Sequence, residues 1–257
     1  MAETDFLEAA EQAARLAGKV LGSWSKKFTV SEKSPANLVT EADFAAQEAI
    51  FDHIHTRWPD HGFLGEEGLA VDRTDSPFRW VIDPLDGTSN YVHGFPYYAV
   101  SIALEQDGEA LIGVVFDPNR DEMFAVIRGH KALLNGQPIR PTEIGTLQQA
   151  MLVASLPVAV TPNDPAVARF LRVIPHAQTV QRTGSAALNL VYVAAGRIEA
   201  FWSSSLKPWD MAAGALIVRE AGGRVSQMDG SEFAIEVPNV LASNGTSLHV
   251  ELQQLLI

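Results

Sequence analysis

The sequence predicts an α/β fold in which helices cover layered β-sheets, and three patterns lead to this prediction. Two segments with helical periodicity open the chain. A run of short segments with alternating polar and apolar residues follows, and beyond about residue 146 strand-like and helix-like segments alternate. Helices and sheets that each carry an apolar face bury these faces by packing in layers.

The two N-terminal segments are predicted to form amphipathic helices. Over residues 4–24 apolar side chains recur at three- and four-residue steps, and the run 40–57 repeats this spacing. Such spacing places the apolar side chains on one buried face of each helix. Between the two helices we expect a polar loop through Lys33, Pro35 and Asn37.

The next part of the chain is predicted to form an antiparallel meander. Its expected strands cover residues 98–105, 111–116 and 123–127. Turn residues at Asp107-Gly108 and Pro118-Asn119 separate these strands, and Asn135-Gly136 is a further hairpin signal. Antiparallel pairing is the simplest arrangement for strands joined by such short turns.

The last part of the chain is predicted to alternate between strands and helices. Strands are expected at 151–155, 198–202 and 240–242, and helices at 165–173, 185–195 and 210–220, before a last helix. No repeat or long linker interrupts the pattern. We therefore predict a single domain over residues 1–257, with an N-terminal antiparallel-sheet subregion (about 1–145) and a C-terminal strand–helix subregion (about 146–257).

The composition of the chain argues against several kinds of binding partner and excludes chemistry that depends on cysteine. Hydrophobic residues make up 47% of the chain, which is enough for a full core. The formal net charge of -12 opposes binding to nucleic acid or to an anionic membrane, so neither partner is expected. The chain has no cysteine, which excludes disulfides, thiolate zinc sites and iron–sulfur clusters and leaves oxygen and nitrogen groups for the chemistry.

The start of the chain and its apolar segments predict a cytoplasmic location. Residues 1–11 carry several acidic side chains and lack the basic and apolar blocks of a secretory signal. No segment approaches the roughly 20 consecutive apolar residues that cross a bilayer.

The hexapeptide Asp83-Pro84-Leu85-Asp86-Gly87-Thr88 is the most informative feature of the sequence. It follows the apolar, strand-like run 78–82, so it places two carboxylates at the end of a strand. Carboxylate oxygens are ligands for hard divalent cations, and Gly87 allows the backbone to approach an anion closely. This pattern predicts a metal site next to a phosphate-sized turn.

Further acidic residues can join this turn. Glu66 and Glu67 lie between two glycines, Asp210 follows a tryptophan at a helix start, and Asp43 lies in the first turn of the second helix. Each one alone is typical of a solvated turn, a helix cap or a partner of the helix dipole, and that alternative stays open for Asp43. Together with the hexapeptide they supply enough carboxylate for two or three cations, which would neutralise their mutual repulsion.

These segments resemble the inositol monophosphatase family of magnesium-dependent, lithium-sensitive phosphatases, and the resemblance covers nearly the whole chain. The segments that carry it, in order, are Lys33-Ser34-Pro35 through Thr40-Glu41-Ala42-Asp43, Gly65-Glu66-Glu67, the stretch 80–94 around the hexapeptide, Gly184-Ser185-Ala186-Ala187, and Trp209-Asp210-Met211-Ala212-Ala213-Gly214. The resemblance implies a layered αβαβα sandwich of the sugar phosphatase type, a homodimer, and two to three Mg²⁺ per subunit, with Mn²⁺ as a substitute.

The resemblance also implies a set of metal ligands. One magnesium would be held by Glu66, Asp83 and the carbonyl of Leu85. A second would lie between Asp83, Asp86 and Asp210, so that Asp83 bridges the two ions. A third, weaker ion would use Glu66 again. Ligation by oxygen alone favours Mg²⁺ or Mn²⁺ over zinc.

The same resemblance implies roles in catalysis and substrate binding. Glu66 and Thr88 would hold the attacking water, and Asp43 would accept a hydrogen bond from Thr88. The amides of Gly87 and Thr88 would bind phosphoryl oxygens. The remaining substrate contacts implied are Ser185, Ala186, Ser203, Asp210 and Lys33, although a solvated Lys33 is the open alternative.

The substrate end departs from the family pattern. Ser203 stands where inositol-hydrolysing members have an acidic residue, and Gln181, followed by Arg182, stands where an arginine is common. Loss of a charged hydrogen-bond acceptor costs roughly 1.5–3 kcal/mol of binding. Inositol 1-phosphate is therefore the default substrate, with histidinol phosphate and a sugar bisphosphate as alternatives.

A regulatory or binding protein on this fold is the alternative from another class, because a fold does not fix a function. The complete carboxylate set favours the enzyme.

Overall fold

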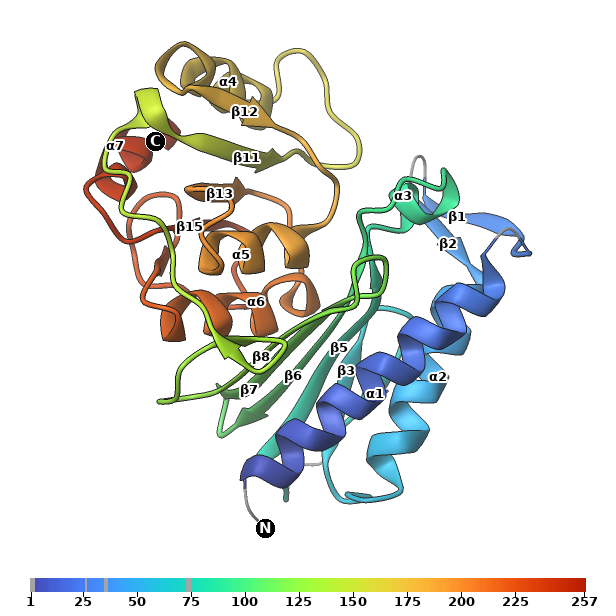
Figure 1. Cartoon of the computed structure of the whole chain (residues 1–257). Helices are drawn as coiled ribbons and strands as arrows, with labels where there is room; N and C mark the ends of the chain where they lie inside the picture. The colour runs from blue at the N-terminus through green and yellow to red at the C-terminus, as the bar shows by residue number, and fades with distance from the viewer. Residues whose placement is uncertain (1–2, 26, 35–36, 73–74) are drawn as a thin grey trace.

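A computed structural model describes residues 3–25, 27–34, 37–72 and 75–257, without the side chains of residues 33, 34, 37 and 38. Five layers follow one another (Figure 1): helices α1 and α2, an eight-stranded sheet, helices α5 and α6, a five-stranded sheet, and helices α4 and α7. The predicted α/β fold with an αβαβα arrangement is thereby confirmed. Whether the two subregions are one folding unit remains a prediction.

The first two layers contain most of the N-terminal half. Helices α1 (Glu3–Trp24) and α2 (Glu41–His55) cover the outer face of the eight-stranded sheet. The sheet order is β10-β9-β8-β7-β6-β5-β3-β4. Its strands are β3 (Gly62–Gly65), β4 (Ala70–Val71), β5 (Phe78–Asp86), β6 (Ala99–Gln106), β7 (Glu109–Asp117), β8 (Glu122–Ile127), β9 (Leu133–Leu134) and β10 (Gln137–Pro138).

Pairing in this sheet follows the predicted meander. β5, β6, β7, β8, β9 and β10 pair antiparallel in sequence order, whereas β3 runs parallel to β5. Asp107 and Gly108 both have positive φ in the turn between β6 and β7, as the short hairpin requires.

The C-terminal half provides the other layers. The five-stranded sheet has the order β12-β11-β13-β15-β14, and β11 is parallel to both of its neighbours. Its strands are β11 (Met151–Ser155), β12 (Thr179–Gln181), β13 (Ala200–Ser203), β14 (Arg224–Ser226) and β15 (Val240–Ser243). The helices are α4 (Pro165–Val173), α5 (Ala186–Ala194), α6 (Pro208–Glu220) and α7 (Leu248–Leu256), with 3₁₀ turns at Leu147–Gln149 and Ile174–His176.

Both sheets are apolar on both faces because both faces are covered. On β6, Ile102 and Leu104 belong to the core beneath α1 and α2, whereas Ala103 belongs to the core around α5 and α6. In the five-stranded sheet Phe201 faces the α5 and α6 layer, and Trp202 faces the core shared with α7. Successive side chains of a strand therefore point into different cores, and both cores are apolar because a helical layer covers each face of the sheet.

One sequence prediction, the polar loop between the first two helices, differs from the structure on both sides of residues 35 and 36, and Pro35 itself lies outside the described residues. Instead of a polar loop, the chain forms a two-stranded antiparallel ribbon of β1 (Val30–Ser34) and β2 (Asn37–Thr40). The ribbon lies outside the two main sheets, so it has little of the apolar patterning that marks a buried strand. In the described part of the chain, no helix has the length and apolar character that a membrane span requires.

Candidate metal and phosphate site

The predicted metal turn lies at the end of β5, where the strand leaves regular pairing with β6. Asp83 pairs with Ser101 and Asp86 with Ala99, so the intervening residues bulge out of the ladder. The backbone N–H of Leu85 donates to Asp83 Oδ1 at 3.0 Å. Asp83 and Asp86 are both buried. The bulge brings two carboxylates, which would alternate faces on a regular strand, to one place.

Gly87 ends this turn and begins the short helix α3 (Thr88–Val92). Its φ is +97°, and a Cβ atom there would lie 3.1 Å from the carbonyl oxygen of Tyr97 and 3.3 Å from that of Gly184. Both the backbone conformation and the close packing therefore require glycine.

Asp43 joins helix α2 to this turn. One oxygen, Oδ2, accepts from the backbone N–H of Thr40 at 2.9 Å and from its hydroxyl at 2.6 Å, which completes a capping box. The other, Oδ1, accepts from the hydroxyl of Thr88 at 3.2 Å. Burial raises the pKa of the Asp43 carboxyl, while the hydrogen bonds from Thr40 lower it. Asp43 therefore serves as a helix cap and contacts Thr88 as well.

Asp86 is held by the N-terminus of α5. Its Oδ2 accepts from the Ser185 hydroxyl and from the backbone N–H of Ala187, the latter at 2.8 Å. Ser185 is also the N-cap of α5, because its Oγ accepts from the N–H of Leu188 at 3.2 Å. A carboxylate at this position is stabilised by unpaired N–H groups and by the helix dipole. Burial nevertheless raises the pKa of Asp86.

Asp210 comes from the first turn of α6 in the C-terminal half. Its Oδ2 accepts from the backbone N–H of Lys207 at 2.7 Å, so it caps the helix start. Burial and the neighbouring Asp86 raise the pKa of Asp210, and a side-chain hydrogen bond with Asp83 lowers it.

Asp83, Asp86 and Asp210 converge from the two halves of the molecule. Each offers one oxygen, and these three oxygens lie within 4.8 Å of one another. Burial raises the pKa of Asp83 strongly, and the charges of Glu66, Asp86 and Asp210 raise it further. Glu66 follows β3, and its backbone N–H donates to the Ile82 carbonyl at 3.3 Å.

The donor set fits divalent cations that prefer oxygen. The cluster consists of carboxylates. Burial, and then the charges of the neighbouring carboxylates, raises the pKa of Asp83 and of Asp210, and a bound cation would offset both effects. The hydroxyl of Thr88 also lies 3.2 Å from the carbonyl oxygen of Leu85, which places this predicted carbonyl ligand beside the same turn. Roles as ligands remain predictions for Glu66, Asp83, Leu85, Asp86 and Asp210.

A cavity of about 580 Å³ adjoins the carboxylates. Asp86 and Asp210 lie in its wall with Ala186, Ser155 and Ser205. Among the described residues that line it, Arg182 is the one cationic side chain. Such a volume suits a small ligand.

The predicted substrate contacts lie in different places in the structure, and only some of them line the cavity. Ser203 is fully buried in β13, outside the cavity wall, and its hydroxyl has no hydrogen-bond partner among the described residues. Ser185 points to Asp86, and Ala186 lines the cavity. Lys33 belongs to β1, but its side chain lies outside the described part of the chain.

Sequence reasoning missed two residues that organise the site. Thr40 holds Asp43, and the spacing Thr40-x-x-Asp43 is that of a capping box, which could have identified it. Asn90 lies in the cavity wall and joins two backbone segments. No local pattern predicts this second role, because one of the segments is far away in the sequence.

Comparison with known proteins places this site in a family. The sequence profile of the inositol monophosphatase family matches residues 2–257. An inositol-1-monophosphatase of Mesorhizobium japonicum is 40% identical over 248 residues, which cover 95% of this chain and 93% of that protein. The Nus factor SuhB of Pseudomonas aeruginosa is 39% identical over 247 residues, covering 93% of this chain and 91% of that protein.

A solved structure agrees with these sequence matches. The crystal structure of the extragenic suppressor protein SuhB from Bartonella henselae superposes with a TM-score of 0.93 at 36% identity, and the match covers 98% of both chains.

Proposed function

Because the chain belongs to the inositol monophosphatase family, a family of phosphatases, we propose that it hydrolyses a small phosphate monoester at the Asp83 turn with bound Mg²⁺. The observation that carries this proposal is the convergence of Asp83, Asp86 and Asp210 within 4.8 Å. Two or three ions would be held by these carboxylates with Glu66 and the carbonyl of Leu85, and Mn²⁺ would substitute.

The cations would supply Lewis-acid chemistry that neutralises phosphoryl charge and lowers the pKa of the attacking water. The protein would position that water. Glu66 and the Thr88 hydroxyl are the proposed partners. The Thr88 hydroxyl lies 3.2 Å from both Asp43 Oδ1 and the Leu85 carbonyl oxygen, and it would relay a proton from the water only while its own hydrogen points to Asp43, because the carbonyl cannot take up a proton. Asp43, fixed by Thr40, would therefore orient the hydroxyl and take up the proton.

The phosphoryl group would lie against the amides of Gly87 and Thr88. The leaving group would then extend into the cavity, toward Ser205 and Arg182. Inositol 1-phosphate remains the default substrate. Among the alternative substrates, Arg182 favours a sugar bisphosphate, because a guanidinium binds a second phosphate well.

A substrate panel tests this proposal. Phosphate release should be measured with inositol 1-phosphate, histidinol phosphate, a sugar bisphosphate and glycerol 2-phosphate, each with Mg²⁺ or with a chelator. We expect turnover that the chelator abolishes and that Asp210→Asn removes, whereas Asp60→Asn, an exposed carboxylate outside the site, leaves it unchanged. Full turnover in the chelator or in Asp210→Asn would refute the proposed metal site.

A regulatory role is the second candidate, because one relative is named a Nus factor. It predicts stable association with a protein or RNA partner and no turnover on any ester of the panel.

Three further proposals come from the family resemblance. Lithium should inhibit turnover, which an inhibition assay tests; the protein should be a homodimer, which sedimentation tests; and it should be cytoplasmic, which fractionation tests.

A further inference from the structure

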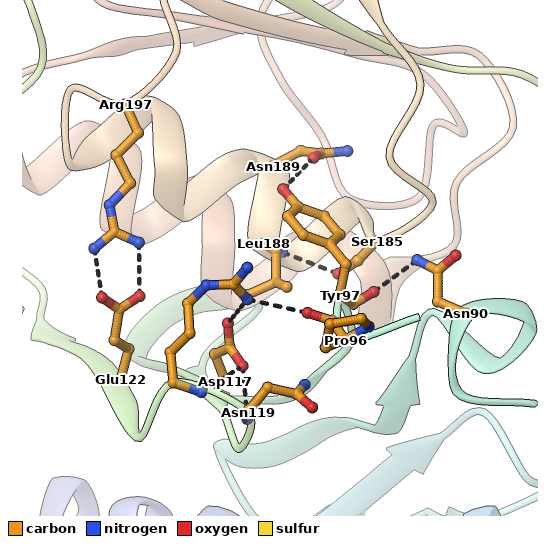
Figure 2. A network of polar contacts seen from close by, with 11 residues as sticks. Asn90, Pro96, Tyr97, Asp117, Asn119, Glu122, Ser185, Leu188, Asn189 and Arg197 are labelled. Carbon is orange, nitrogen blue, oxygen red and sulfur yellow. Dashed lines mark hydrogen bonds and ion pairs between the residues drawn. The ribbon is translucent and has the colours of Figure 1, made fainter. Parts of the chain in front are cut away.

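Asn90 joins the two halves of the molecule at the candidate site. Its side-chain Nδ2 donates to the carbonyl oxygen of Tyr97 at 2.7 Å and to that of Thr183 at 2.8 Å. Figure 2 shows Asn90 pointing from α3 toward Tyr97. Both amide protons are therefore used by backbone carbonyls, one before β6 and one before α5. Among natural side chains of this size, only a carboxamide can donate twice from one atom.

The segments joined by Asn90 leave no space for a different arrangement. Gly184 has a φ of +91°, and a Cβ atom there would lie 2.9 Å from Asn90 Nδ2. The carbonyl of Gly184 in turn packs against Gly87 in the metal turn. The backbone of residues 183–184 is thus in direct contact with α3 and with the turn that precedes it.

This segment leads directly into the groups that hold Asp86. Ser185 follows Gly184, and its hydroxyl and the N–H of Ala187 both donate to Asp86 Oδ2. The Thr183 hydroxyl donates to Asn189 Oδ1 at 2.6 Å, so the segment is also tied to α5 itself. Any shift of residues 183–184 would move the two donors that orient the Asp86 carboxylate.

We propose that Asn90 is a positioning residue for the metal site: it fixes the start of α5 against the metal turn, so that Asp86 presents its second oxygen to the cation. This inference rests on the proposed function insofar as Asp86 binds metal. Asn90 itself contacts neither the carboxylates nor the reacting atoms, and it acts through Ser185 and Ala187. Removing a group that orients a metal ligand typically weakens metal affinity 10- to 100-fold.

Asn244 provides a matched control. Its Nδ2 also donates twice, to the hydroxyl of Thr142 at 3.0 Å and to the carbonyl of Ile144 at 2.8 Å. Asn244 follows β15 and is not in the wall of the cavity beside the carboxylates. Asn244→Ala therefore removes a similar bridge in the same protein without disturbing the support of Asp86.

The test is calorimetric titration of the full-length, metal-free protein with Mn²⁺. We expect Asn90→Ala to raise the Mn²⁺ Kd about tenfold or more, and Asn244→Ala to leave it within twofold of wild type. Ser185→Ala should add little further weakening to Asn90→Ala, because both act through Asp86. If Asn90→Ala does not fold, Asn90→Asp replaces it in the test. The aspartate keeps the size of the side chain but has no donor for the two carbonyls, so it should weaken Mn²⁺ binding as Asn90→Ala does.

An unchanged Kd in folded Asn90→Ala or Asn90→Asp, or equal weakening by Asn244→Ala, would overturn the positioning role. Failure of the proposed metal site gives a different result, because wild-type protein would then bind no Mn²⁺. Failure of the proposed hydrolysis would appear as absent turnover in the substrate panel while wild type still binds Mn²⁺.

Discussion

The two halves of the molecule contribute to the candidate site in different ways. In the N-terminal half a single strand end supplies Asp83, Asp86 and the glycine turn, and α2 adds Asp43. In the C-terminal half the contributions come from separate elements: Asp210 from α6, the Asp86 support from α5, and the cavity wall from the end of β11 and the segment that follows β13.

This difference separates chemistry from recognition. The metal turn depends on local backbone geometry, such as the bulge in β5 and the positive φ of Gly87. Those features tolerate few substitutions. The cavity wall is built from exposed or partly exposed side chains such as Ser155, Arg182 and Ser205, which can change without loss of the fold. We therefore expect substitutions in the metal turn and substitutions in the cavity wall to affect different kinetic parameters.

The largest effect is expected for Asp83→Asn in the N-terminal half. Asp83 is buried among Glu66, Asp86 and Asp210, and loss of Lewis-acid stabilisation worth several kcal/mol corresponds to a roughly 10³-fold lower kcat. Steady-state assays of phosphate release measure this fall in kcat. Because the substitution also removes a repelled charge, the metal-free variant should unfold at a higher temperature than metal-free wild type. Activity within tenfold of wild type would contradict the bridging role.

Thr88→Ala is expected to have the next largest effect. The variant lacks the hydroxyl that donates to Asp43, and general acid–base assistance is typically worth at least about 10²-fold in rate. We expect kcat to fall by about this factor with little change in KM. Thr88→Ser keeps the hydroxyl and should retain most of the activity. Equal losses in the two variants would exclude the hydroxyl as the active group.

Substitution of His249 on α7, away from the candidate site, is expected to change stability without changing activity. It is fully buried on α7, with Nδ1 2.8 Å from Ser243 Oγ and Nε2 2.9 Å from Ser226 Oγ. Burial lowers its pKa from 6.5 to about 4. The His249 imidazole therefore binds a proton more tightly in the unfolded chain than in the folded protein. As pH falls from above 6.5 toward 4, protonation of the unfolded chain lowers the unfolding free energy.

Urea unfolding at pH 8 and pH 5 measures the contribution of His249. Between these pH values, wild type should lose about 2 kcal/mol more unfolding free energy than His249→Gln, because only wild type carries this imidazole. Activity at pH 8 should be the same in both proteins. Parallel pH dependence in the two proteins would show that His249 is not held neutral.

The smallest effect is expected for Arg182→Ala in the cavity wall. A charged hydrogen bond to a second phosphate is worth about 1.5 kcal/mol, which corresponds to an about tenfold higher KM for a sugar bisphosphate. KM for glycerol 2-phosphate should not change, because this substrate has no second phosphate. Equal changes for both substrates would indicate a structural role for Arg182.

The position of the N-terminal part of the candidate site could be predicted from the sequence because its signals are local, whereas the roles of its residues stay predictions. The end of an apolar strand located the hexapeptide, and the structure brings Asp83 and Asp86 together with Asp210 as expected. The layered fold followed from the helical spacing of apolar residues and from the alternation of strands and helices in the C-terminal half. The strands of the meander are buried on both faces, because helical layers cover both. The β1–β2 ribbon was missed because it contributes little to the core.

The substrate side could not be predicted to the same extent. Ser203 was expected in the pocket, but β13 pairs with β11 and β15 and its last residue is fully buried. Instead Ser205 and Arg182 line the cavity. Which residue near a strand end faces a cavity depends on strand register and on how loops pack, and both are set by contacts between distant segments. The Asn90 bridge to Thr183 was hidden for the same reason.

The central claim is that carboxylates from both halves form one binding site for divalent cations. Titration of metal-free wild-type protein and of Asp210→Asn with Mn²⁺, followed by calorimetry, tests it most directly. We predict that wild type binds at least two ions and that Asp210→Asn loses one of them while its fold is unchanged. Identical binding by both proteins, or no binding by wild type, would contradict the account.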